Sequence, residues 1–187
     1  MSLLEGSQQA RALGEYFKDT HFIAILASPL RRAFSTAQAL QDGQDDPKPP
    51  LTSSPLLREQ HFGVAEGKPW DYRYEPNLSL EEHIAMGKFP VIHSDEEKFP
   101  GGESTNDLAI RANQAIEELI LPHVQSAARQ GLKGVHIAVV SHGLCISQLI
   151  AMLLKKDASG AAAGDYRGLL NTAWTRVTID VKVCRHL

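Results

Sequence analysis

Two arginines at the start of an expected helix suit the binding of a phosphate group. Segment 28–32 (Ser-Pro-Leu-Arg-Arg) follows the apolar run Phe22–Ala27 and precedes a helical pattern. Arg31 and Arg32 therefore fall in the first helical turn, where the helix dipole disfavours each cation by about 0.3–1 kcal/mol. Backbone N–H groups without partners point out of that same end, and arginine binds phosphate in a bidentate manner. The pattern predicts an anion site, although two solvated arginines on an exposed turn are the alternative interpretation.

A histidine follows a second apolar run in the same way. Ser141-His142-Gly143 comes directly after Val135–Val140. The carboxyl ends of parallel strands meet at one edge of an open α/β sheet, and such sheets bind ligands there. A histidine at that edge can donate a hydrogen bond to a phosphate or an oxyanion, and Gly143 permits close approach. A hydrogen-bonded corner histidine without a ligand is the alternative.

Carboxylates in two further segments are candidates for acid chemistry. Glu59 and Glu66 lie in Leu57–Lys68, and either could protonate the leaving oxygen of a phosphate ester. Glu103 and Ser104 follow a Pro-Gly-Gly turn that is not a Walker loop, because no Gly-Lys-Ser/Thr follows. Taken alone, the first segment is more typical of a solvated loop than of a site, and the second is more typical of a helix entry than of a site.

Helices and strands alternate along the chain, and they must position these residues. Apolar spacing predicts helices at Ser7–Lys18 and Leu144–Lys155, and a further helix that runs from an N-cap at Ser28, with Pro29 as its first residue, to about Leu40. Capping residues predict two more helices. One begins after the Ser79–Glu82 capping box, and the other begins after Ser104 and Asp107 and has a kink at Pro122. Continuous or alternating apolar runs predict strands at His21–Ala27, within Leu51–Leu57, at Val135–Val140 and over Asn171–Val183. The alternation predicts an α/β fold, a three-layer α/β/α sandwich with a mostly parallel sheet.

The length of 187 residues fits one domain over residues 1–187, in which about 64–102 is an irregular insertion or lid. The aromatic residues of this segment either shape a pocket lid or form a satellite core; they are Trp70, Tyr72, Tyr74 and Phe89.

The composition excludes several classes of function. The net charge is −3 without a basic block, so nucleic acid is not an expected partner. No apolar stretch reaches membrane-spanning length, and Met1–Glu5 does not resemble the start of a secretory signal. Two cysteines, Cys145 and Cys184, indicate a reducing, cytoplasmic compartment, and Cys145 is expected to be a buried helix residue. The histidines show no metal-ligand spacing, so neither a metal nor a cofactor is expected.

In this order, the four segments resemble the motifs of the histidine phosphatase superfamily, in its phosphoglycerate mutase-like branch. The resemblance spans residues 5 to 180. The pattern S-x-L-x-R-A-x-x-T-A is met by Ser28, Leu30, Arg32, Ala33, Thr36 and Ala37; L-x-E-x-x-x-G-x-x-E-G by Leu57, Glu59, Gly63, Glu66 and Gly67; P-G-G-E-S by Pro100 to Ser104; and S-H-G by Ser141 to Gly143.

The resemblance implies phosphoryl transfer through a phosphohistidine on a small phosphorylated substrate. By motif position, Arg32 is a phosphate clamp, His142 the second histidine of the site and Glu59 the proton donor. Arg31, Glu103, Ser104 and Gly143 line or support the same pocket. The proline run expected of a mutase is not seen between Gly67 and Pro100, so a phosphatase is favoured over a mutase. The sequence indicates no oligomeric state.

The chain departs from the family pattern at the nucleophile. In the family, the attacking histidine and a second arginine belong to an R-H-G-E motif on a central first strand, and no R-H-G occurs in these 187 residues. We therefore expect a sheet without that strand and an impaired enzyme. The expected cause is a truncated chain, an alternative start or an incomplete gene model. A non-catalytic phosphate-binding pseudoenzyme or interaction module is the alternative.

Overall fold

The computed structural model describes residues 3–71, 73, 75–157 and 171–181. The chain divides into two compact units. The first, which we call the sheet unit, holds residues 1–59 and 111–187; the second, the insert unit, holds residues 60–110. The expectation of a single domain with a lid over about 64–102 stays a prediction.

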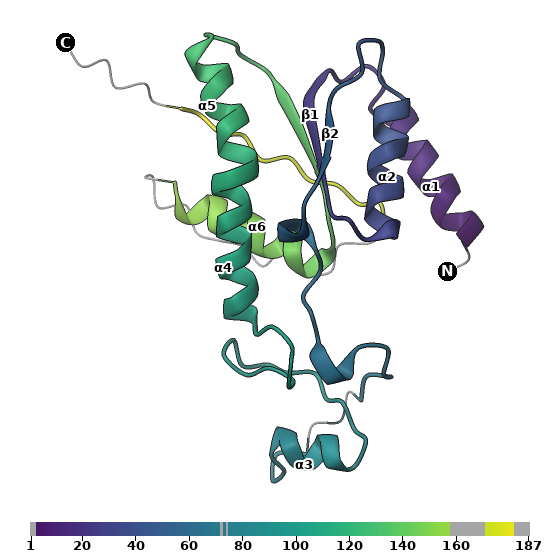
Figure 1. The fold of residues 1–187 in the computed structure, drawn as a ribbon, viewed down its shortest axis with the longest axis vertical. Coiled ribbons are helices and arrows are strands. Elements are labelled where there is room, and N and C mark those ends of the chain that lie inside the picture. Colours follow the sequence, from purple (N-terminus) through teal and green to yellow (C-terminus); the bar gives the residue numbers. More distant parts are fainter. Residues whose placement is uncertain (1–2, 72, 74, 158–170, 182–187) are drawn as a thin grey trace, which may run out of the picture. The chain divides into compact units, whose positions relative to one another are not determined.

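The sheet of the sheet unit is parallel, with the order β2-β1-β3 (Figure 1). Its strands are β1 (Phe22–Ala27), β2 (Leu51–Ser53) and β3 (His136–Val140). The amide of Ser28 donates to the carbonyl of Val140 at 2.9 Å, so β1 and β3 end side by side. The residues after these two strands therefore begin at the same edge of the sheet, as the sequence predicts.

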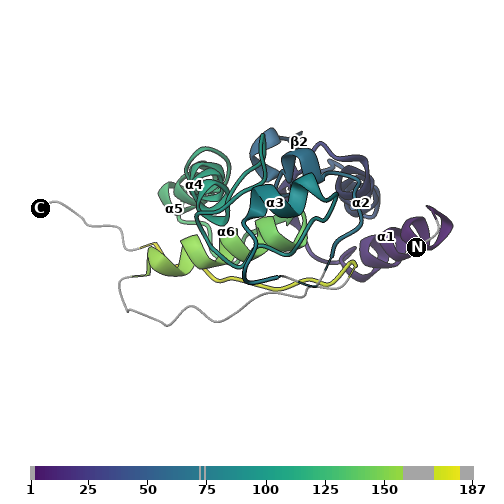
Figure 2. The ribbon, with the colours of Figure 1, turned by 90° about the horizontal axis from the view of Figure 1, so that it is seen from below.

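The helices of the sheet unit cover both sides of the strands. They are α1 (Leu3–Tyr16), α2 (Arg31–Asp42), α5 (Leu121–Arg129) and α6 (Gly143–Lys155). Figures 1 and 2 show α1 and α2 on one side and α5 on the other, which confirms the α/β fold. A Cβ atom at Gly14 of α1 would collide with the carbonyl of Ala39, so glycine is what allows α1 to approach α2 so closely. None of the helices in the described ranges is long and apolar enough to cross a bilayer.

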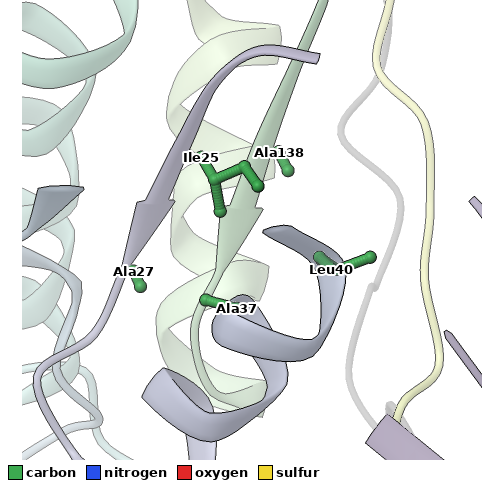
Figure 3. Close-up of a cluster of buried hydrophobic side chains, with 5 residues drawn as sticks. All are labelled: Ile25, Ala27, Ala37, Leu40 and Ala138. Atoms are coloured by element: carbon green, nitrogen blue, oxygen red, sulfur yellow. The ribbon is translucent and has the colours of Figure 1, made fainter. Parts of the chain in front are cut away.

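One cluster of the core of the sheet unit lies between the sheet and α2 (Figure 3). Its buried members are Ile25, Ala27, Ala37, Leu40 and Ala138. Alanine dominates the contact, so the backbone of α2 packs close to the strands. This close packing fixes the start of α2, and with it Arg31 and Arg32, against the end of β1.

The start of α2 differs from the sequence prediction. Its N-cap is Leu30 and no side chain caps it, so the predicted N-cap at Ser28, with Pro29 opening the helix, is wrong. Ser28 instead continues the pairing of β1 with β3, and its hydroxyl contacts His142. Arg31 and Arg32 nevertheless occupy the first helical turn, as predicted.

The predicted strand over Asn171–Val183 is wrong for its described part, since residues 171–181 contain no strand. Trp174 packs against Phe17 with ring centroids 5.2 Å apart. The alternating side chains beyond it are exposed, at 38% for Val177 and Ile179 and 44% for Val181. An alternating pattern becomes a strand only with a hydrogen-bonded neighbour, and no neighbouring strand pairs with this segment in the described chain.

A long helical stretch begins at α4 (Thr105–Ala115), passes through a π-helical turn (Ile116–Ile120) and continues as α5. Ser104 and Asp107 open α4 by two reciprocal hydrogen bonds of 3.1 Å. Pro122 lacks an N–H group, and its ring would clash with the carbonyl four residues earlier in a regular helix. A wider π turn directly precedes Pro122, and the expected kink there stays a prediction.

The insert unit has a small core of its own. Its helix α3 (Leu80–Ala85) begins at the predicted capping box, in which the Ser79 hydroxyl accepts from Glu82 N at 3.2 Å and the Glu82 carboxylate accepts from Ser79 N at 2.7 Å. The buried core residues are Ala65, Leu80, Phe89 and Phe99. Phe89 thus belongs to a satellite core, and Trp70 packs edge-on against Phe62 with centroids 4.9 Å apart. Tyr72 and Tyr74 lie outside the described residues.

Candidate active site

Arg32 and His142 are in direct contact where β1 and β3 end. The Arg32 Nε–H donates to Nδ1 of His142 at 3.1 Å. Because Nδ1 accepts this bond, the proton of the neutral ring is on Nε2, which lies 2.8 Å from the Ser28 hydroxyl oxygen and donates to it. Ser28 is fully buried and His142 is 7% exposed. Arginine and serine together therefore fix both the position and the tautomer of the imidazole.

The surroundings of His142 oppose its protonation. Burial is the main cause, followed by the positive charges of Arg32, Arg111 and Arg58, and together they lower the pKa of His142 from 6.5 to about 4. The ring is therefore neutral at pH 7. Three guanidinium groups around a neutral imidazole form a site of positive potential, which favours an anion.

Glu59 lies at the start of α6, next to the same corner. Its carboxylate accepts hydrogen bonds from the amides of Leu144 at 3.3 Å and Cys145 at 3.1 Å. These are N–H groups of the first helical turn, and the N-cap residue His142 supplies no side-chain cap. Glu59 therefore caps α6 from another segment of the chain, and it lines the same groove as Arg32 and His142.

The structure places the remaining predicted residues as follows. Arg31 is exposed, and its carbonyl accepts from the Ser35 hydroxyl at 2.8 Å. A Cβ atom at Gly143 would meet no atom within 4 Å, so the space in front of this residue is open. The sheet unit thus brings together Arg32, His142 and Glu59, with Arg31 and Gly143 adjacent to them in sequence.

Three other candidates belong to the insert unit. Glu66 accepts from the amide of Phe62 at 2.9 Å, Glu103 accepts from the amide of His61 at 2.9 Å, and Ser104 caps α4. Each of these side chains therefore stabilises the backbone of its own unit.

Two residues near the site have roles that the sequence analysis missed. Arg111 on α4 donates to backbone carbonyls of segment 56–59, and Ser28 holds the imidazole. Arg111 is three residues after the buried Leu108 and four before the buried Ala115, so it lies on the buried stripe of its helix. A charged residue on such a stripe was the available signal. No short-range signal distinguishes Ser28 as a histidine partner from Ser28 as a helix cap.

Neither a metal cluster nor a reactive thiol is found in the part of the chain that the structure describes. No group of three or more His, Cys, Asp or Glu side chains is placed to hold a metal ion there. Cys145 is fully buried in α6, as predicted, and burial raises the pKa of its thiol. Cys184 lies outside the described residues.

Comparison with known families gives one match along nearly the whole chain. Residues 4–186 match the family described as the histidine phosphatase superfamily, branch 1.

Curated relatives include both phosphatases and mutases. The fructose-2,6-bisphosphatase TIGAR B of Danio rerio is 44% identical over 164 residues, which cover 75% of this chain and 60% of that protein. The 2,3-bisphosphoglycerate-dependent phosphoglycerate mutase 2 of Gloeobacter violaceus is 28% identical over 153 residues, which cover 80% of this chain and 62% of that protein. The chain thus spans about 60% of the length of these relatives.

Solved structures agree with the fold. The mycobacterial glucosyl-3-phosphoglycerate phosphatase in complex with VO3 superposes with a TM-score of 0.58 at 27% identity, over 84% of this chain and 70% of that one. The phosphoglycerate mutase of Bacillus anthracis superposes with a TM-score of 0.56 at 26% identity, over 86% of this chain and 70% of that one.

Proposed function

The chain belongs to the histidine phosphatase superfamily, and from this premise we propose that it is a phosphomonoester hydrolase of the phosphohistidine type. The observation that carries the proposal is the contact between Arg32 and His142, with the Glu59 carboxylate at the adjoining helix start. Several relatives are named as phosphatases, which supports hydrolysis.

In this proposal, Arg32 and His142 bind the phosphoryl group. The Arg32 guanidinium retains N–H groups that can donate to phosphoryl oxygens while Nε remains on the imidazole. Because Nδ1 stays on Arg32, the N–H that His142 can offer to the phosphoryl group is that of Nε2, which must exchange the Ser28 hydroxyl for a phosphoryl oxygen. Arg31 and Gly143 border this position, whereas the roles of Glu103 and Ser104 rest on the resemblance alone.

Glu59 is the proposed proton donor. In a complete site, a histidine nucleophile forms a bond to phosphorus as the bond between phosphorus and the ester oxygen breaks. The carboxylic acid of Glu59 transfers its proton to that oxygen, which leaves as an alcohol. Water then attacks the phosphohistidine and releases inorganic phosphate, and Glu59 recovers a proton. For this step Glu59 must exchange its contacts with the amides of Leu144 and Cys145 for the leaving oxygen. Glu66 holds a loop amide of the insert unit and is the second candidate.

The nucleophile is the part of the mechanism that these residues do not supply. No Arg-His-Gly occurs in the 187 residues, and His142 occupies the position of the other histidine. Catalytic groups that act as a unit are strongly non-additive, so we propose that the 187 residues by themselves bind phosphate and turn over substrate orders of magnitude more slowly than a complete site.

A phosphate-binding module without catalysis is the second candidate function, and the same absent motif favours it. A mutase is the third, since some relatives are named phosphoglycerate mutases, but the sequence lacks the proline run expected of a mutase between Gly67 and Pro100. The names of the relatives support a small phosphorylated metabolite as substrate. We place the protein in the cytoplasm on its cysteine content, as a proposal.

The test measures binding and turnover separately. Phosphate and vanadate binding to the 187-residue chain is measured by calorimetry, with Arg32→Met as the variant expected to weaken it. Hydrolysis of p-nitrophenyl phosphate is then compared between this chain and a form extended at its N-terminus through an Arg-His-Gly-Glu motif. Turnover by the extended form that falls in Glu59→Ala supports the enzyme. If the extended form shows no turnover that Glu59→Ala reduces, the assignment as an enzyme is overturned. If phosphate binds but neither form hydrolyses the substrate, the non-catalytic phosphate-binding module is the function that remains.

A further inference from the structure

We infer that Arg111 is a positioning residue that holds Glu59 against the start of α6. The inference rests on the proposed function only for the role of Glu59 as proton donor. Nη1 of Arg111 donates to the carbonyls of Leu56 at 2.9 Å and Arg58 at 2.8 Å, and Nη2 donates to the carbonyl of Glu59 at 3.2 Å. One guanidinium thus binds three carbonyls within the four residues that end at Glu59.

The hydroxyl of Ser141 binds the remaining carbonyl of this segment. It donates to the carbonyl of Leu57 at 2.7 Å. All four carbonyls from Leu56 to Glu59 therefore accept hydrogen bonds from two side chains, one on α4 and one at the corner that also carries His142. The segment lies beyond the end of β2 and has no strand ladder to hold it. Four hydrogen bonds from two side chains thus fix the position of this partly buried backbone.

The consequence reaches the carboxylate of Glu59. Its two hydrogen bonds to Leu144 and Cys145 require the Glu59 backbone to stay at a fixed distance from α6. Arginine is suited to the task because its planar fork presents several N–H groups in fixed directions, which lysine cannot reproduce. The charge of Arg111 also contributes to the low pKa of His142, so the same side chain acts on both proposed catalytic groups.

The test uses signals that a merely structural role would not change. In ¹H–¹⁵N spectra of the full chain, the amide signals of Leu144 and Cys145 report their hydrogen bonds to the Glu59 carboxylate, and Glu59→Gln identifies the part of their chemical shifts that the charged carboxylate causes. In Arg111→Met the signals of the two amides should move in the same direction as in Glu59→Gln. Their protection from hydrogen exchange should fall about tenfold, while Leu149 and Ile150 further along α6 keep theirs.

Two further variants complete the design. Arg111→Lys keeps the charge without the fork and should behave as Arg111→Met; if Arg111→Met does not fold, Arg111→Lys decides. Arg129→Met, at the end of α5, is the matched control and should change neither amide. Unchanged amide chemical shifts and unchanged protection in Arg111→Lys would overturn the inference. No phosphate enters this experiment, so a failure to bind phosphate would overturn the proposed function alone.

Discussion

Nε of Arg32 donates a hydrogen bond to Nδ1 of His142 over 3.1 Å, although 110 positions separate the two residues in the sequence. The contact exists because β1 and β3 are parallel neighbours that end at the same edge of the sheet. It keeps one ring nitrogen without a proton and a positive charge beside the ring, so the neutral imidazole is the form that this structure selects.

The first prediction concerns stability and pH. The pKa of His142 is about 4 in the folded chain and 6.5 without the fold. Above pH 6.5 the His142 imidazole is neutral in both the folded and the unfolded state, so it does not change the free energy of unfolding with pH. As the pH falls from 6.5 to 4, only the unfolded state takes up the proton, so the free energy of unfolding should decrease by about 3 kcal/mol in total. Urea unfolding at several pH values measures this loss, and His142→Gln should remove it; an equal slope in that variant would contradict the prediction.

The second prediction separates the two arginines. Arg32→Met removes the partner of His142, and charge-assisted hydrogen bonds contribute about 1.5–3 kcal/mol, so phosphate affinity should fall about 10- to 100-fold. Arg31→Met is the matched control and should cost less, because the guanidinium that donates to His142 is that of Arg32. The imidazole titration followed by NMR should also move toward higher pH in Arg32→Met, since a nearby positive charge is lost. Equal losses of affinity in both variants would count against the assignment of Arg32.

The third prediction concerns Glu59 as a helix cap. Glu59→Ala leaves the amides of Leu144 and Cys145 without the carboxylate and should destabilise the chain by about 0.5–2 kcal/mol, as loss of a side-chain cap does. Glu59→Gln keeps one oxygen acceptor and should lose less. Urea unfolding of the three proteins at pH 7 provides the comparison. A Gln variant as unstable as the Ala variant would show that the contact does not act as a cap.

The fourth prediction compares two glycines. Gly143→Ala adds a methyl group that meets no atom within 4 Å, at the first residue of α6, so the free energy of unfolding should stay equal or rise by up to about 1 kcal/mol. Gly14→Ala places its methyl group against the Ala39 carbonyl and should cost about 1–3 kcal/mol. If phosphate approaches the open space at Gly143, the Gly143→Ala variant should remain stable and bind phosphate more weakly. Unchanged affinity would exclude that approach.

Short-range rules account for what the sequence predicted correctly. The continuous apolar runs gave β1 and β3, the Ser79–Glu82 and Ser104–Asp107 pairs gave the starts of α3 and α4, and the apolar spacing gave α2 and α6. Each of these signals depends on residues within about four positions of one another, so neighbouring side chains are sufficient to produce it. The same rules misassigned Ser28, since a serine before a helix resembles a cap whatever its hydroxyl binds in the fold.

The sequence by itself determined the family, the α/β alternation and the two corners that carry Arg32 and His142. Tertiary structure alone decided that Ser28 and Arg32 hold the imidazole, that Glu59 caps α6 and that Arg111 and Ser141 bind the carbonyls of segment 56–59. The physical reason is distance along the chain. These contacts join residues that are 50 or more positions apart, and their partners are set by strand register and helix packing, which no local pattern encodes.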